Sequence, residues 1–389
     1  MEKEGMSSVD VVVSESGWPS GRGGLVTTPQ FAQAYNQHFV KKFMAMQSTP
    51  KRPNHYLYLQ KMSSSLTILV LSTVALLLHY HVGITEADIG VNYVSEGFNR
   101  PPPATVVQLL KSNGIGKVRL FDPNVDMLNA LAGSGIDVTL GIPNQDIRTI
   151  ASSYREAMKW FNTHVLAHTN CWRYLAEYVL PAMQNIQAIK ELYQLNGLRV
   201  TTVVGANSLG SFDPPSSGAF YGEARPHIVG ILKFLSNTSS PLLVNVYPYF
   251  VYASDPAKVR LEYALGTATV PLVQDGNLGY KTMLDAMVDA YYWAMEKEGV
   301  SSVDVVVSES GWPSGGGGLV TTPLFAQACN QHFVKKFMAM QSTPKRPDHY
   351  LEGFIFEMFN DDQKSPGVDQ HWGLFKPDGT PVYPVFTEG

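Results

Sequence analysis

The sequence has very little cysteine: Cys171 and Cys329 are the only two in 389 residues. Two cysteines cannot build the multi-bridge framework that stabilises small secreted domains, so the fold must depend on a packed core. The sequence also lacks a CxxC pair and a His–Cys cluster, so nothing in it indicates a zinc site. We therefore expect neither a metal nor any other cofactor.

Long runs of one residue type are missing as well. No basic run exceeds a few residues and the net charge is −4, which argues against nucleic acid as a partner. The apolar run Leu66–Leu78 has thirteen residues, whereas a membrane-spanning helix needs about 20. The C-terminal sequence PVYPVFTEG has no apolar tail. We therefore expect no stable membrane anchor.

Residues 1–57 repeat residues 295–351 almost letter for letter, and both copies contain VDVVVSESGWPS. Repeat proteins use periods of about 20–50 residues several times over, so one copy at this distance is not a structural repeat. It indicates a recent duplication or a mis-joined gene. Five positions differ: Met6/Val300, Arg22/Gly316, Gln30/Leu324, Tyr35/Cys329 and Asn54/Asp348.

A segment resembling a signal peptide follows the first copy. Leu66–Leu78 has the length of a signal-peptide apolar region, and Thr85-Glu86-Ala87 offers a small-x-small cleavage site. A buried core helix is the alternative interpretation. A signal peptide acts at an N-terminus, so we expect a secreted protein, in the cell exterior or cell wall rather than the vacuole. Three segments are predicted: a copy outside the mature fold (1–61), a signal-like segment (62–87) and the working domain (88–389).

Within the working domain, short β-rich runs alternate with longer stretches that carry apolar residues at helical spacing. This alternation predicts an α/β fold, a (β/α)8 TIM barrel. A doubly wound sheet is the alternative, but no GxGxxG follows the first run. The predicted strands are 88–93, 117–122, 137–143, 172–176, 199–204, 241–250, 303–312 and 353–359.

Barrel enzymes carry their chemistry at the C-terminal ends of the strands. Amides, aromatic rings and carboxylates are predicted there, a mixture that suits a sugar polymer, because rings stack on pyranose faces and amides bond hydroxyls. Aromatic side chains in the core are the competing interpretation. The candidates are Asn92, Tyr93, Asn245, Tyr247, Tyr249, Glu309, Trp312, Phe359, Asp361 and Lys364, with the three from 241–250 expected on one face of their strand.

The segments DIGVNY, KVRLFDPN, VLPAMQNI, NVYPYF, VSESGWPS, FNDDQK and HWGLFKPDGTPVYPVF occur in this order. Residues 88–389 thereby resemble the plant endo-β-1,3-glucanases of glycoside hydrolase family 17. The resemblance implies a β-1,3-glucan substrate, a retaining mechanism and Glu309 as nucleophile. It implies substrate-binding roles for the other candidates, although Asp361 stands where the family usually has Glu. We expect a monomer.

The acid/base glutamate implied by the resemblance is missing. The family reads roughly RYIAVGNEV at strand 4, whereas this chain reads RYLA followed directly by EYVLPAMQNI, which truncates the strand. Glu177 is a poor substitute, since it lies three residues before the expected acid, about 10 Å along a strand and on the opposite face. We expect Glu177 to be a charge at a helix N-terminus. A remote alternative is that residues 9–18 fill the gap and supply Glu15.

Two functions remain open. The first is hydrolysis of internal β-1,3-glucosidic bonds, impaired by the missing acid/base. The second is a barrel that binds β-glucan without hydrolysing it. A mis-joined gene would explain both the extra N-terminal copy and the lost segment.

Overall fold

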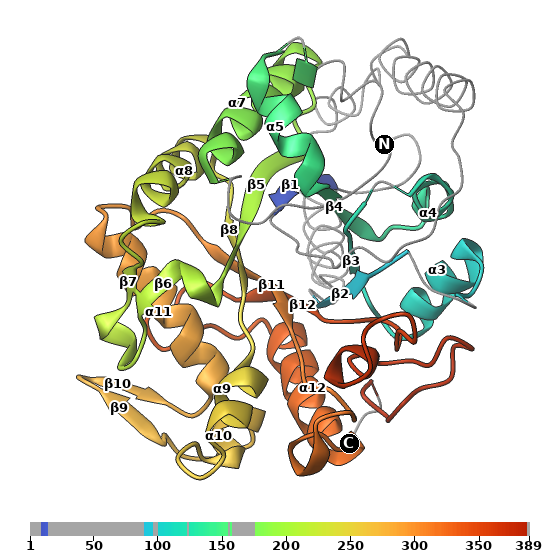
Figure 1. Ribbon diagram of the computed structural model, residues 1–389, viewed down its shortest axis with the longest axis vertical. Coiled ribbons are helices and arrows are strands. Elements are labelled where there is room, and N and C mark those ends of the chain that lie inside the picture. The colour runs from blue at the N-terminus through green and yellow to red at the C-terminus, as the bar shows by residue number, and fades with distance from the viewer. Residues whose placement is uncertain are drawn as a thin grey trace, which may run out of the picture.

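The computed structural model describes residues 9–14, 89–95, 100–122, 124–154, 156–157 and 176–386. In this part of the chain eight parallel strands form a closed barrel in the order β1-β4-β3-β2-β12-β11-β8-β5 (Figure 1). The TIM-barrel prediction is therefore confirmed. The barrel strands are β1 (Val9–Ser14), β2 (Ile89–Tyr93), β3 (Lys117–Leu120), β4 (Asp137–Ile142), β5 (Leu198–Gly205), β8 (Leu242–Asn245), β11 (Val305–Ser310) and β12 (Glu352–Ile355).

Helices surround the barrel, as Figure 1 shows, and two small hairpins extend from it. The hairpins pair β6 (Leu209–Ser211) with β7 (Ala219–Phe220) and β9 (Val273–Asp275) with β10 (Leu278–Tyr280). The helices are α3 (Pro103–Ser112), α4 (Val125–Leu131), α5 (Asn144–Ser152), α7 (Ala176–Leu192), α8 (Arg225–Thr238), α9 (Pro248–Ser254), α10 (Leu261–Leu265), α11 (Met283–Lys297) and α12 (Pro323–Met338).

Local sequence explains where the two helices nearest β11 begin and end. The Thr282 side chain accepts a hydrogen bond from the backbone N–H of Asp285, and Thr322 does the same for Phe325, so each threonine caps a helix N-terminus. Gly299 follows α11 with a φ of 74°, a conformation that glycine adopts without steric cost. These caps fix where α11 and α12 begin, and α11 packs against β11 while α12 packs against β12.

The fourth position of the barrel is occupied by β1, from the N-terminal copy. Val9–Val13 pairs with Val138–Ile142 of β4, and Val9–Ser14 pairs with Leu198–Val203 of β5. Six residues of the N-terminal copy thus fill the fourth-strand gap, as the remote alternative for residues 9–18 had it, whereas the exclusion of 1–61 from the mature protein stays a prediction. Two open parallel edges needed a strand, and a run of valines suits a strand buried on both faces.

The remnant assigned to the fourth strand from sequence, 172–176, is not a strand where the structure describes it. Ala176 begins α7, and residues 172–175 lie outside the described residues. The signal-like segment 62–87 also lies outside them. The truncated fourth strand is thus replaced by a six-residue strand from another part of the chain.

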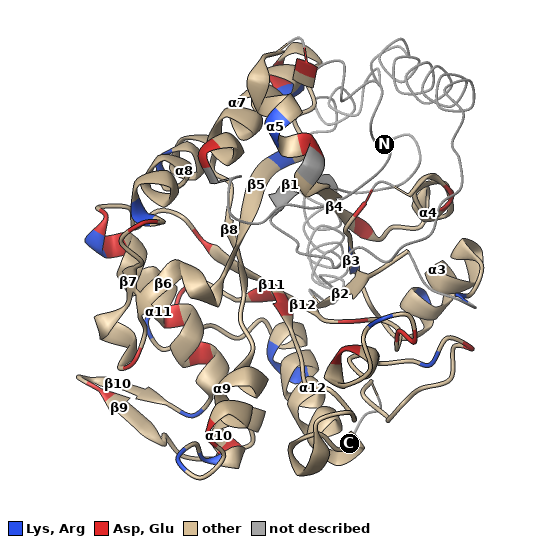
Figure 2. Ribbon diagram, viewed as in Figure 1, with Lys and Arg blue, Asp and Glu red and all other residues tan. Residues whose placement is uncertain are grey.

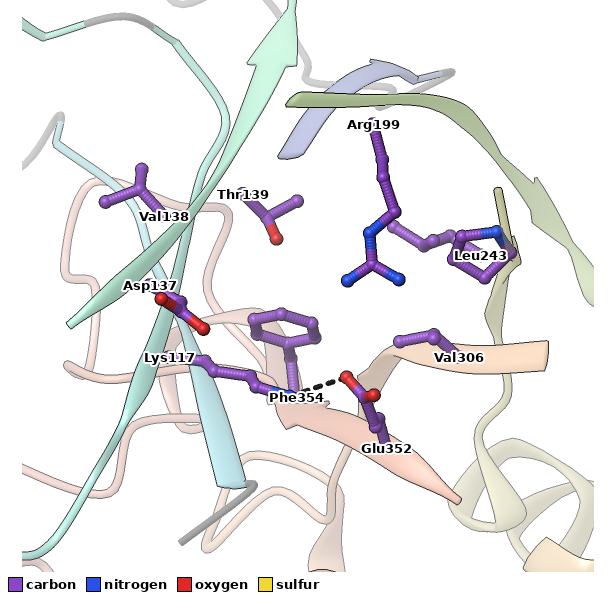
Figure 3. Close-up of a pocket in the computed structure, with 10 residues that line it drawn as sticks. Lys117, Asp137, Val138, Thr139, Arg199, Leu243, Val306, Glu352 and Phe354 are labelled. Atoms are coloured by element: carbon purple, nitrogen blue, oxygen red, sulfur yellow. Dashed lines mark hydrogen bonds and ion pairs between the residues drawn. The ribbon is translucent and has the colours of Figure 1, made fainter. Parts of the chain in front are cut away.

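The barrel interior is layered. Its middle layer is a small apolar cluster formed by Val203, Leu243, Val306 and Phe354. At the N-terminal ends of the strands a pocket is lined by charged residues, and there Lys117 Nζ lies 2.6 Å from Glu352 Oε2 (Figure 3). Asp137 and Arg199 line the same pocket. In barrels this face serves stability, which leaves the opposite face for chemistry.

Charges of both signs are dispersed over the described helices and loops, without a long basic stripe (Figure 2). Among the described residues, no helix has the length and apolar character needed to cross a membrane.

Candidate active site

Glu309 lies next to the C-terminal end of β11, and its carboxylate faces the barrel interior. Along β11 the ladder to β8 runs from Val307↔Val244 directly to Glu309↔Asn245, so one residue is skipped. Simple alternation would put Glu309 on the same outer face as Val307, which is buried in the core cluster beneath the helices. The irregular register, a bulge-like feature, turns the glutamate inward. The prediction that Glu309 faces the axis agrees with this geometry.

Arg119 of β3 holds the Glu309 carboxylate from across the interior. Its Nη1 lies 2.6 Å from Glu309 Oε1 and also donates to Asn92 Oδ1 at 2.9 Å. The guanidinium is fully buried and lies 4.4 Å from the centroid of the Phe121 ring. Asn92, in turn, donates to the backbone oxygens of Ser308 and Ile355, so it orients Arg119 from within the wall.

The sequence interpretation missed Arg119. The available signal was a charged residue in the middle of an apolar strand, KVRLFD, because an arginine is rarely buried without a partner. Two further donors of its guanidinium, Nε and Nη2, have no hydrogen-bond partner among the described residues.

Tyr247 donates its hydroxyl to Glu309 Oε2 at 3.0 Å. Burial, and then the adjacent Glu309 charge, raises the pKa of Tyr247 well above its ordinary value, so the phenol remains a neutral donor. The predicted strand 241–250 is too long, since β8 ends at Asn245 and Pro248 begins α9. Proline favours the first position of a helix, so the chain turns into α9 here. Asn245, Tyr247 and Tyr249 therefore do not lie on one face of a single strand.

Asn245 supports the strand that carries Glu309. Its Oδ1 accepts a hydrogen bond of 2.6 Å from the Ser308 hydroxyl, directly beside the register irregularity. Asn245 therefore helps to fix the backbone that aims the carboxylate.

The aromatic candidates form two packed groups, most of which lies beneath the surface. Trp312 is fully buried and donates to the backbone oxygen of Val320, so its ring presents no surface to a ligand. Tyr249 packs edge-on against Trp312, and Tyr93 packs edge-on against the buried Phe359. The competing interpretation of these rings as core therefore holds for Trp312 and Phe359.

Phe250 and Trp372 were missed. Phe250 is half exposed, and its ring lies 5.3 Å from Tyr247 and 5.7 Å from Trp372. Phe250 contacts Tyr247, and Tyr247 donates to Glu309. Phe250 is therefore an exposed ring only one residue removed from the carboxylate.

Asp361 and Lys364 are each held in an ion pair. Asp361 Oδ2 lies 3.3 Å from Arg100 Nη2, and Lys364 Nζ lies 2.5 Å from Glu357 Oε1. Asp361 and Glu357 are almost completely buried, whereas Lys364 retains a little exposure. Glu357 is a further carboxyl that the sequence interpretation missed.

The comparisons with known proteins agree with this geometry. The sequence profile of glycosyl hydrolases family 17 matches residues 89–386. This chain belongs to glycosyl hydrolase family 17. It is therefore an O-glycosyl hydrolase by family.

Two curated relatives of this family-17 chain come from plants. It is 44% identical over 319 residues to a probable glucan endo-1,3-beta-glucosidase of Arabidopsis thaliana, covering 78% of this chain and 92% of the relative. It is 41% identical to lichenase-2 of Hordeum vulgare, covering 77% of this chain and 98% of that one.

Two solved structures support the fold of the family-17 barrel. One, from a study of two plant beta-glucan endohydrolases with distinct substrate specificities, has a TM-score of 0.71 and 39% identity, covering 77% of this chain and all of that one. The other, a beta-1,3-glucanase and pollen allergen of Cryptomeria japonica, has a TM-score of 0.72 and 38% identity, covering 77% and 98%.

The fourth strand of this family-17 barrel supplies no carboxyl at its C-terminal end among the described residues. The described part of β1 carries one acidic residue, Asp10, and its register partner is Arg199 at the opposite end of the barrel. Glu177 is exposed in the first turn of α7, as predicted. Glu15 lies outside the described residues.

The site can therefore hold one carboxylate in place against two donors, at the C-terminal end of the barrel. Among the described residues, no group of three or more His, Cys, Asp or Glu side chains is arranged to hold a metal ion. The chemistry that this arrangement supports directly is nucleophilic attack by Glu309 on an anomeric carbon.

Proposed function

We propose that this family-17 chain hydrolyses internal β-1,3-glucosidic bonds of β-glucans with retention, with Glu309 as nucleophile. The observation that carries the proposal is the Glu309 carboxylate, bound by Arg119 at 2.6 Å and Tyr247 at 3.0 Å. Two fixed donors hold the carboxylate in one orientation, which is what attack on an anomeric carbon needs.

The relatives' names support the substrate class. One is named as a glucan endo-1,3-beta-glucosidase and another as a lichenase, so β-glucans are common to both. The exposed Phe250 ring beside Tyr247 offers an apolar face for a pyranose ring. We favour the β-1,3 linkage because more of the similar relatives carry that name.

We further propose that hydrolysis is slow in this chain, because the described part of the fourth strand ends without a carboxyl. A retaining glycosidase uses a second carboxyl about 5–5.5 Å from the nucleophile to protonate the leaving oxygen. General acid catalysis typically contributes about 10²–10⁴-fold, and an unactivated sugar leaving group depends on it. A leaving group such as 2,4-dinitrophenolate does not.

The test compares laminarin with a dinitrophenyl β-laminaribioside, each with and without sodium azide. The proposal expects weak laminarin hydrolysis, clear release of dinitrophenolate, and a β-configured glycosyl azide when azide intercepts the glycosyl–Glu309 intermediate. Laminarin hydrolysis as fast as that of the dinitrophenyl substrate, with no glycosyl azide formed from either, would contradict the missing acid/base. Mixed-linkage β-glucan, run in parallel, tests the linkage.

The second candidate is a barrel that binds β-glucan without hydrolysing it. The lack of a carboxyl at the C-terminal end of the described part of β1 favours this candidate over full activity. Isothermal titration with laminari-oligosaccharides separates the two. Binding with no dinitrophenolate release would favour this candidate, whereas release that Glu309→Gln abolishes would exclude it.

A further inference from the structure

Glu357 is fixed directly after β12 at the same end of the barrel as Glu309. Its backbone N–H donates to the Trp372 oxygen, and its own oxygen accepts from the Leu374 N–H. Its side chain is only 1% exposed, and Oε1 accepts a hydrogen bond of 2.5 Å from Lys364. A buried glutamate with a fixed backbone and one cationic partner has little freedom to move.

A short series of contacts joins this pair to the nucleophile. The Lys364 ammonium lies 4.9 Å from the centroid of the Phe356 ring, and Phe356 packs edge-on against Tyr247 at 6.3 Å. Tyr247 donates to Glu309. The charges of Glu309 and Glu357 both raise the pKa of Tyr247, whereas the charge of Arg119 lowers it. The two carboxyl groups therefore share one electrostatic environment.

Charged groups of both signs surround Glu357. Lys364 and Asp361 lie on its own segment, and Arg100 faces it from the segment before α3. Glu309 of β11 and Arg119 of β3 lie beyond Tyr247, while Asp369 acts on Tyr249. Three ion pairs result, Arg100–Asp361, Lys364–Glu357 and Arg119–Glu309, so the loss of one negative charge leaves one cation unbalanced.

We propose that Glu357 is a positioning residue of the active site: it holds Lys364 against the Phe356 ring that packs on Tyr247, and its charge balances that of Lys364 near the reacting sugar. This proposal rests on the proposed function. It assigns Glu357 no contact with substrate, because its side chain has almost no exposed surface.

The direction of the effect follows from the charge on the sugar. Burial raises the pKa of Glu357 to about 7, although the Lys364 charge and hydrogen bond oppose the rise. The transition state of glycoside cleavage carries positive charge on the sugar ring. Ionised Glu357 balances Lys364 and favours that charge, whereas protonated Glu357 leaves Lys364 unbalanced and disfavours it. Glycosylation of Glu309 should therefore accelerate as pH rises through about 7.

The experiment follows kcat/KM for the dinitrophenyl laminaribioside from pH 5 to pH 9. This substrate needs no general acid, so no acid limb obscures the result. We expect the wild-type rate to rise about tenfold across neutral pH, the order expected for one unit charge at partial screening. Glu357→Gln keeps the shape and an acceptor for Lys364 but cannot ionise. It should match the wild type at pH 5, show no rise, and fall about tenfold below it at pH 9.

Two further variants sharpen the result. Glu357→Asp retains an ionisable group and should restore a rise. Glu352→Gln removes a carboxylate that is ion-paired with Lys117 at a similar distance, but at the opposite end of the barrel, and should leave the profile parallel to that of the wild type. A rise that persists in Glu357→Gln would overturn the proposal.

A second measurement separates this proposal from the proposed function. Because the folded-state pKa of about 7 exceeds the ordinary value of 4.5, the native state binds the extra proton between these values. The stability of the wild type relative to Glu357→Gln should therefore fall as pH rises from about 4.5 to about 7 and change little above pH 8. Absent dinitrophenolate release from all variants would contradict the proposed function alone. A pH-independent difference in Tm would contradict the role of Glu357.

Discussion

The barrel uses one six-residue sequence, VDVVVS, in two places: as β1 (Val9–Ser14) and, at 303–308, across the start of β11. In β1 the ladder to β5 advances evenly, with Val13 opposite Thr202 and Ser14 opposite Val203. In β11 the ladder to β8 skips Ser308, although this residue corresponds to Ser14. Identical residues therefore take different registers, so the irregularity that aims Glu309 depends on its neighbours, notably Asn245, which binds the Ser308 hydroxyl.

The positions where the two copies differ show that only the residues of the second copy fit the segment that follows β11. Gly316 has a φ of 82°, and a Cβ there would lie 2.3 Å from the Gly367 backbone, yet the N-terminal copy has Arg22 at this position. Cys329 is buried in α12, where the N-terminal copy has Tyr35. The fold thus restricts the second copy at positions where the first has different residues.

The largest expected difference between the copies is catalytic. Glu309→Gln should lower kcat/KM for the dinitrophenyl laminaribioside by at least about 10³-fold, because it removes the proposed nucleophile. Glu15→Gln, the same change in the first copy, should leave the rate within about twofold, because β1 shows no register shift up to Ser14. A large loss in Glu15→Gln would show that the first copy supplies the missing carboxyl.

The next difference concerns stability, and it tests whether the two strands are equivalent in the wall. Val306→Pro and Val12→Pro each remove a ladder N–H and leave an acceptor unpaired, and each should cost about 2–3 kcal/mol of unfolding free energy. Urea denaturation measures both. An unchanged urea midpoint in Val12→Pro would show that β1 is not part of the barrel. Val306→Pro serves as the positive control.

The smallest difference comes from moving residues of the first copy into the second. Cys329→Tyr places a ring in a filled core and should cost about 1–3 kcal/mol. Leu324→Gln, the matched control at an exposed site of the same helix, should change stability by less than about 0.5 kcal/mol. Differential scanning calorimetry of the two variants compares them directly. Equal shifts would mean that burial does not explain the divergence of the copies.

Much of the fold follows from the sequence. Alternating β-rich and helical runs identify seven of the eight strands, because strands buried on both faces read as continuous apolar runs. The run 241–250 shows the limit, since its aromatic residues continue past Asn245 while Pro248 already begins a helix. The main error was to place the fourth strand at 172–176 and to keep residues 9–18 only as a remote alternative. No local pattern in Val9–Ser14 indicates which two strands it pairs with.

The candidate site was less predictable than the fold. Glu309, Tyr247 and Lys364 follow from motifs at strand ends, and the structure gives each a hydrogen bond or ion pair there. Arg119 was missed because its partner Glu309 is 190 residues further along the chain, across the barrel. Glu357 was missed although its partner Lys364 is close in sequence, because no local pattern shows that this glutamate is buried. Trp312 shows the converse: its motif is specific, but the ring is fully buried.

The position of β1 has a consequence for synthesis. Its last register partner, Val203, is about 190 residues further along the chain. At a translation rate of roughly 5–20 residues per second, β1 leaves the ribosome about 10–40 seconds before β5 exists. Pairings between segments so far apart form slowly, because the entropy of closing the intervening loop must be overcome first. Barrel closure should therefore be the last step of folding and the one most sensitive to temperature. The fourth strand is synthesised first but is the last to pair.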